Sequence, residues 1–151
     1  MISLDVLTTT LQRHLALELP DGLPLALPGI VLDAETTPEW IEFSCDAMDG
    51  VAQRDSPAEL RDVRVTLQVF VRTSIHTTRI QALAETARAV ISGRVIDVID
   101  RTASDEPVIG AIRFREADVR DLTRLHAAQQ RRPLRHVVVT ARGVVHAFAE
   151  Q

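Results

Sequence analysis

The clearest pattern in the chain is an alternation of apolar and polar residues over 63–71. Apolar side chains occupy the odd positions and polar ones the even positions, and Phe70 alone breaks this order. Successive side chains of a strand point to opposite faces, so the pattern predicts a long antiparallel strand with one face on a core. Three other segments carry strand patterns: 40–45, 108–117 and 134–146. Gly143 in the last of these predicts a β-bulge, whereas the short run 95–99 fits either a strand or a helical turn.

Two segments show the spacing of amphipathic helices. Residues 3–17 repeat leucine and valine at roughly helical intervals, and Ser3 or Asp5 is suited to cap the first turn. Residues 78–92 carry a second apolar stripe, followed by Gly93 as a suitable residue just beyond a helix end. We therefore expect one helix at the start of the chain and one near its middle.

The segment 23–32 contains Pro24, Pro28 and Gly29, which predict an extended stretch or an edge strand. The predicted order is then helix, strands, helix, strands, with few helical crossovers between strands. This order predicts an α+β fold: a mainly antiparallel sheet with two helices packed on one face. We find no internal repeat or linker, so residues 1–151 are expected to form a single domain.

The composition is that of an ordinary globular protein, with 46% hydrophobic and 25% charged residues. The sequence contains no run of about 18 consecutive apolar residues, so we predict no membrane span, and we expect no secretory signal. The net charge of −4 argues against broad wrapping of nucleic acid, because such binding depends on neutralising phosphates. All 17 cationic residues are arginine, and Lys, Asn and Tyr are absent, which indicates a GC-rich genome of a bacterium or a bacterial virus.

Candidate chemistry is sparse, and we predict no catalytic residue, cofactor site or metal site. The single cysteine, Cys45, falls inside a strand pattern, and no serine lies in a G-x-S-x-G setting. The five histidines are scattered without metal-ligand spacing, and the six glycines form no phosphate-binding loop. A role in binding other protein subunits therefore fits this chain better than an enzymatic one.

The main charge cluster consists of Arg131, Arg132 and Arg135 around Pro133. Arginine is well suited to contact phosphate or the carboxylates of a neighbouring subunit. Arg131 and Arg132 lie in the polar segment 120–133, for which we predict a loop or a frayed helix, and Arg135 follows it; a solvated loop would need no partner. Both interpretations stay open, and so does a binding role for the long connection 46–59.

The order of elements resembles the tail terminator proteins of long-tailed bacteriophages and the related tail-completion proteins of gene transfer agents. The resemblance is one of layout and covers nearly the whole chain. Its features are a helix with Leu11 and Leu15, a Pro-rich stretch 23–30, the strand 40–45, a long loop, the strand 63–71, the helix around 83–91 and two closing strands.

The resemblance implies a homo-oligomeric ring, typically a hexamer, at the head-proximal end of the tail tube. Such a ring would stop growth of the tube by occupying its end, and it would offer a surface to the head–tail connector protein. DNA would cross the lumen, which an acidic protein suits because a basic one would hold the phosphates. The implied location is the virion tail or neck, assembled in the bacterial host cytoplasm. No residue roles are carried over from the family.

Two other hypotheses remain beside this one. A head–tail connector or neck protein is of similar size and also forms rings. A small bacterial enzyme or ligand-binding domain with an α+β fold would instead need a concave pocket with converging polar groups.

Overall fold

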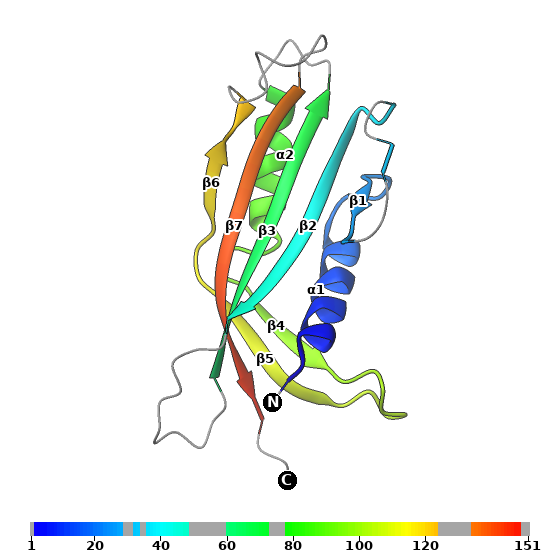
Figure 1. The fold of residues 1–151 in the computed structure, drawn as a ribbon, viewed down its shortest axis with the longest axis vertical. Coiled ribbons are helices and arrows are strands. Elements are labelled where there is room, and N and C mark those ends of the chain that lie inside the picture. Colours follow the sequence, from blue (N-terminus) through cyan, green and yellow to red (C-terminus); the bar gives the residue numbers. More distant parts are fainter. Residues whose placement is uncertain are drawn as a thin grey trace.

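A curled sheet of seven strands and two helices makes up the described part of the chain (Figure 1). The computed structural model describes residues 2–28, 32–33, 36–48, 60–72, 78–123 and 134–148. The elements, in chain order, are α1 (Leu4–Glu18), β1 (Leu25–Ala26), β2 (Glu39–Met48), β3 (Leu60–Arg72), α2 (Thr78–Ala89), β4 (Val95–Ile99), β5 (Val108–Phe114), β6 (Asp118–Asp121) and β7 (Leu134–Ala147).

The strands are arranged in the order β1-β2-β3-β7-β5-β4, and β6 pairs with β7 beside this path. Only β1 runs parallel to its neighbour, and the other pairs are antiparallel. β7 pairs with β3 along almost its whole length. Its other edge is shared, because β6 pairs with the first half of β7 and β5 with the second half. The predicted α+β class and mainly antiparallel sheet are confirmed.

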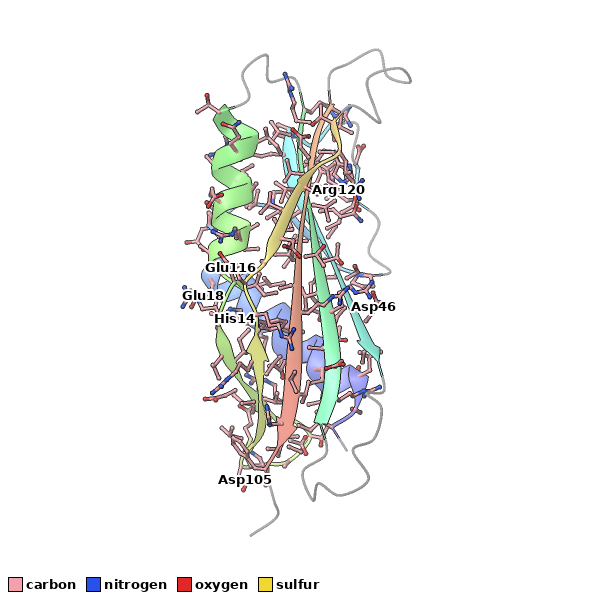
Figure 2. The ribbon with its side chains drawn as sticks, turned by 90° about the vertical axis from the view of Figure 1, so that its left-hand side faces the viewer. His14, Glu18, Asp46, Asp105, Glu116 and Arg120 are labelled. Atoms are coloured by element: carbon pink, nitrogen blue, oxygen red, sulfur yellow. The ribbon has the colours of Figure 1, made fainter. Side chains whose placement is uncertain are left out.

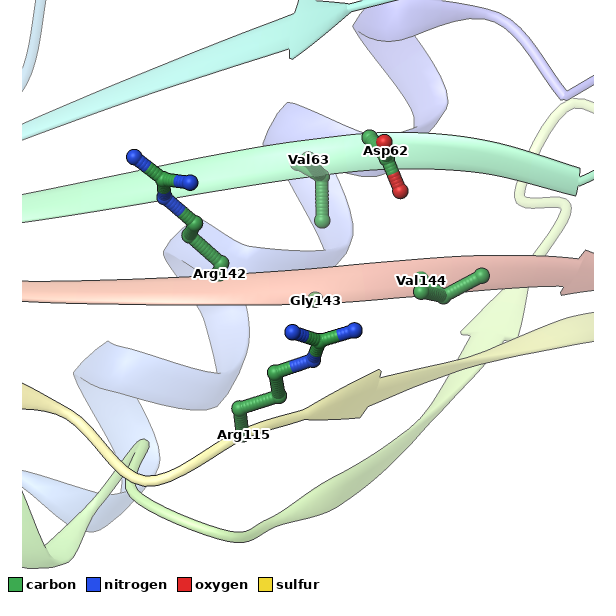
Figure 3. Close-up of a pocket in the computed structure, with 6 residues that line it drawn as sticks. All are labelled: Asp62, Val63, Arg115, Arg142, Gly143 and Val144. Carbon is green, nitrogen blue, oxygen red and sulfur yellow. The ribbon is translucent and has the colours of Figure 1, made fainter. Parts of the chain in front are cut away.

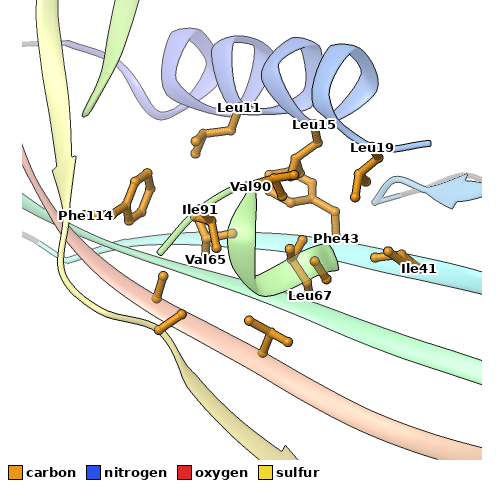
Figure 4. Close-up of a cluster of buried hydrophobic side chains, with 14 of the residues drawn as sticks. Leu11, Leu15, Leu19, Ile41, Phe43, Val65, Leu67, Val90, Ile91 and Phe114 are labelled. Carbon is orange, nitrogen blue, oxygen red and sulfur yellow. The ribbon is translucent and has the colours of Figure 1, made fainter. Parts of the chain in front are cut away.

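The core follows from the alternation that the sequence shows. The odd-numbered residues of β3 from Val63 to Val71 are all buried, and they join one cluster with apolar residues of β2, β7 and both helices. Figure 4 shows this cluster between α1 and the strands. Burying a side chain of this kind contributes roughly 1.5–3 kcal/mol relative to leaving it in water. The fold is therefore held mainly by this single apolar layer.

The two helices contact different parts of the sheet. α1 contacts β2 and β4, whereas α2 contacts β3 and β7. The Ser3 side chain accepts a hydrogen bond from the Val6 backbone N–H at 3.3 Å, as predicted for the N-cap of α1. The Nε2 atom of His14 on α1 lies 2.7 Å from the carbonyl oxygen of Val90, just beyond α2. The sheet is curled, and α1 contacts strands other than those that α2 contacts. The packing of both helices on one face of the sheet therefore stays a prediction.

Several predicted boundaries are wrong by a few residues. The predicted strand 40–45 extends to Met48, so the first residues of the expected connection 46–59 belong to β2, and residues 49–59 lie outside the described ranges. The predicted helix 78–92 ends at Ala89, and a turn continues to Gly93 with a φ of +66°. The predicted strand 108–117 ends at Phe114.

The structure decides one segment that the sequence left open and corrects another. The ambiguous run 95–99 is strand β4, in which Ile96 and Val98 alternate with more exposed residues. Residues 120 and 121 were expected in a loop or frayed helix, but they belong to β6, whose four residues are all exposed. Because β6 has no buried face, its sequence carries no alternation, and only pairing with β7 makes it a strand. β1, in contrast, confirms the edge strand expected within 23–32.

The predicted β-bulge at Gly143 is wrong. The pairings of β7 with β3 and with β5 run through Gly143 without a shift in register. A Cβ atom at this position would lie 2.9 Å from Cδ1 of Phe114 and 3.1 Å from Cγ2 of Ile112. Glycine is needed here because the Phe114 ring packs directly against the backbone of β7.

We expect Gly143→Ala to destabilise the fold by about 1–3 kcal/mol, because the added methyl group must displace a buried aromatic ring. Urea unfolding monitored by circular dichroism measures this change. In a Phe114→Leu background the same substitution should cost clearly less, since the clashing ring is gone. An equal cost in both backgrounds would show that the clash with Phe114 is not the cause.

Candidate functional site

A shallow cavity opens at the point where β5 separates from β7. Its volume is about 110 Å³. The lining residues are Asp62, Val63, Arg115, Arg142, Gly143 and Val144 (Figure 3). They come from β3, from β7 and from the residue that follows β5, so three segments far apart in the sequence build the site.

The two arginines are positioned by strand pairing. Arg142 lies on β7 opposite Arg64 of β3, at an even-numbered register position that faces away from the core. The backbone N–H of Arg115 donates a 2.8 Å hydrogen bond to the carbonyl oxygen of Arg142, which holds the two residues side by side. Gly143 lies between them and carries no side chain (Figure 3). The backbone of β7 at Gly143 thus lines the cavity beside two guanidinium groups.

The electrostatics of this site favour a small anion. Arg115 and Arg142 are both exposed, and no ion pair or side-chain hydrogen bond joins either guanidinium to another residue of the described ranges. Asp62 at the rim contributes one negative charge, so two arginines and one aspartate leave a local charge of +1. Guanidinium groups present planar sets of N–H donors that match a carboxylate or a phosphate. We name this group of three charged residues the arginine site.

An aromatic stack lies farther along the same face, across three neighbouring strands. Trp40 of β2, Phe70 of β3 and His136 of β7 occupy one row of the register. Phe70 stacks on Trp40 with ring centroids 4.8 Å apart and on His136 with centroids 4.3 Å apart. Phe70 broke the alternation of its strand because it belongs to this second apolar cluster, separate from the main core.

Polar groups complete the stack. The indole N–H of Trp40 donates to Oε1 of Glu42 at 3.1 Å, and Nε2 of His136 lies 3.0 Å from Oε1 of Gln68. The Arg72 guanidinium lies 5.7 Å from the centre of the Trp40 ring, in range for a cation–π interaction. Trp40, Phe70 and His136 are 2%, 8% and 6% exposed, so the rings are covered and hold strands together rather than forming an open binding surface.

The predicted arginine cluster divides between two parts of the chain. Arg135 lies in β7, paired with Val71, and is half-buried, within the strand that the sequence predicted over 134–146. Arg131 and Arg132 lie outside the described residues. A contact of these arginines with a neighbouring subunit stays a prediction. The arginine site was missed because the 27 positions from Arg115 to Arg142 separate its two cations in the sequence.

Cys45 lies on the core side of β2, half-buried beneath α1. Burial raises the pKa of its thiol to about 11, and the charge of Asp46 acts in the same direction. A hydrogen bond with Thr8 and the charge of Arg61 oppose this shift without overcoming it. A reactive cysteine needs a lowered pKa, so the geometry favours the predicted packing role.

Comparison with known proteins adds no relative, since no family model, no curated protein and no solved structure matches the chain. Within the ranges that the structure describes, no three His, Cys, Asp or Glu side chains gather closely enough to hold a metal ion. Among the described helices, none combines the length and apolar composition needed to cross a membrane.

We expect Phe70→Ala to lower the free energy of unfolding by about 3 kcal/mol, because it removes the middle ring of a buried stack. Emission of Trp40, the single tryptophan, should shift to longer wavelength as its ring becomes exposed. Urea unfolding followed by this fluorescence measures both effects. Phe148→Ala is the matched control, since Phe148 is 54% exposed and its loss should change stability by less than about 0.5 kcal/mol.

We expect Cys45 to react with iodoacetamide about 100-fold more slowly at pH 8 in the native protein than in urea, because only the thiolate reacts. The raised pKa also has a consequence for stability. Above about pH 9 the unfolded thiol ionises first, so the free energy of unfolding should fall as the pH rises toward 11. Rapid labelling of the native protein would instead indicate an activated cysteine.

Proposed function

We propose that this protein is a virion structural subunit, a tail terminator that forms a ring at the head-proximal end of a bacteriophage tail tube. The ring would stop tube growth by occupying its end, and no bond chemistry is involved. The order of elements supports the proposal, because the helix, edge strand, long paired strands and second helix follow the layout on which the resemblance was drawn.

The open edges of the sheet carry the proposal. β4 ends the sheet on one side, and in the described part of the chain β6 pairs only with β7. Each of these strands exposes a valine, since Val95 of β4 is 59% exposed and Val119 of β6 is 44% exposed. Open strand edges with apolar side chains are natural surfaces for association with another chain.

The opposite side of the sheet is also incompletely covered. β1 pairs with β2 only at Ile41 and Glu42, so the described segments leave the rest of that edge without a strand neighbour. A subunit with unlike edges on its two sides favours contacts between different surfaces of adjacent copies. Such heterologous contacts form a closed ring when the rotation that relates one copy to the next divides a full turn into a whole number of steps. The partners we propose are further copies of this chain, the tail tube protein and the head–tail connector, with DNA passing through the lumen.

We expect the purified protein to form a closed ring, with a hexamer as the predicted form. Native mass spectrometry and negative-stain imaging test this directly. Val95→Asp and Val119→Asp should each weaken ring formation, because a charge would enter an apolar contact, while leaving subunit stability within about 0.5 kcal/mol of wild type.

Leu17→Asp provides the matched control for these variants. Leu17 is 84% exposed on α1 and belongs to neither β4 nor β6, and its replacement should leave the ring intact. A protein that is monomeric at all concentrations and absent from assembled particles would contradict the proposed function. Rings that bind the head connector but not the tail tube would favour the alternative neck-protein role.

A further inference from the structure

We propose that the arginine site, formed by Arg115, Arg142 and Asp62, receives the carboxylate of Asp105 from a second copy of this chain. The proposal rests on the proposed ring assembly and names a contact within it. The contact requires a site that can bind one carboxylate and an exposed carboxylate that has no partner in its own chain. The two must also lie too far apart to meet within one copy.

The receptor is built to bind an anion of limited size. The backbone hydrogen bond between Arg115 and Arg142 holds β7 and the residue that follows β5 side by side, and the two guanidinium groups lie on either side of the backbone at Gly143 (Figure 3). A cavity of about 110 Å³ admits a carboxylate with its adjoining methylene group. Val144, which is half-buried, lines the remaining wall and suits the aliphatic part of an acidic side chain.

Charge favours a protein carboxylate over a nucleic-acid backbone. With Asp62 at the rim, the local charge of +1 is neutralised by one carboxylate. A nucleic acid would bring a series of phosphates, and its binding increases with the number that basic residues neutralise. The whole chain carries a net charge of −4, which opposes such a partner.

The protruding carboxylate belongs to the turn between β4 and β5. Asp100 accepts hydrogen bonds from the backbone N–H and the hydroxyl of Thr102, at 2.9 and 2.6 Å, and Arg101 pairs with Glu106 at 3.0 Å. These contacts stabilise the turn, and they give the other two acidic residues, Asp100 and Glu106, partners within it. Asp105 is exposed, and no ion pair or hydrogen bond connects its side chain to the described residues.

One copy cannot make this contact with itself. The arginine site lies where β5 ends, whereas Asp105 precedes the start of β5, and the seven residues of that strand span about 23 Å. Figure 2 places Asp105 at one end of the molecule. The contact therefore joins unlike surfaces of two copies, which is the geometry that a closed ring requires.

A charge-reversal series tests the proposal. Arg115→Glu with Arg142→Glu, or Asp105→Arg alone, should each weaken self-association by about 30-fold or more, because each change brings like charges together at the interface. Combining Arg142→Glu with Asp105→Arg in one chain should restore assembly, since the pair is then reversed. Arg113→Glu is the matched control: Arg113 is an exposed arginine of β5 that does not line the cavity, and its reversal should leave assembly unchanged.

Analytical ultracentrifugation over a concentration series measures each association constant, and urea unfolding confirms that each variant is folded. If wild-type rings form and the Arg115/Arg142 reversal leaves them intact, the contact is wrong while the proposed function stands. If the reversal leaves rings intact but lowers the affinity for a short DNA duplex, measured by fluorescence anisotropy, the site binds nucleic acid and the proposal is overturned. If the wild-type protein stays monomeric, both proposals fail. Failure of the combined reversal to restore assembly would exclude Asp105 as the partner.

Discussion

The pairing of β3 with β7 is the interaction on which the rest of the structure depends. The register runs from Leu60 opposite His146 to Arg72 opposite Leu134 without interruption. β2 attaches to one side of this ladder and β5 and β6 to the other, so every other strand is placed by it. A slip of one residue would turn the buried valines and leucine of β3 toward solvent, and the apolar layer beneath both helices would be lost.

The face of this ladder opposite the main core serves two purposes along its length. At one end the stacked rings of Trp40, Phe70 and His136 cover each other across three strands and add a second apolar cluster. At the other end Gly143 allows Phe114 to pack closely beneath β7, and charged residues occupy the surface above it. One strand thus holds the sheet together at one end and presents the arginine site at the other.

The surface features that we connect to function lie at the margins of this sheet. Exposed valines lie on the edge strands β4 and β6, and the turn that holds Asp105 extends from the β4–β5 hairpin. We interpret them as surfaces for association between chains, because they offer apolar area, backbone edges without a strand neighbour in the described residues, and exposed charge. Ring assembly at the end of a tail tube is the role that we propose for them.

The sequence by itself determined the elements whose burial is periodic. The alternation over 63–71 and the leucines around Leu11 predicted β3 and α1, because a half-buried strand or helix repeats its apolar residues at a regular interval. Only the tertiary structure decided three features: that β6 is a strand, that Gly143 is needed because Phe114 packs against it, and that Arg115 lies beside Arg142. β6 has no buried face to mark it, and the other two depend on ladder contacts between residues far apart in the chain, which local periodicity does not record.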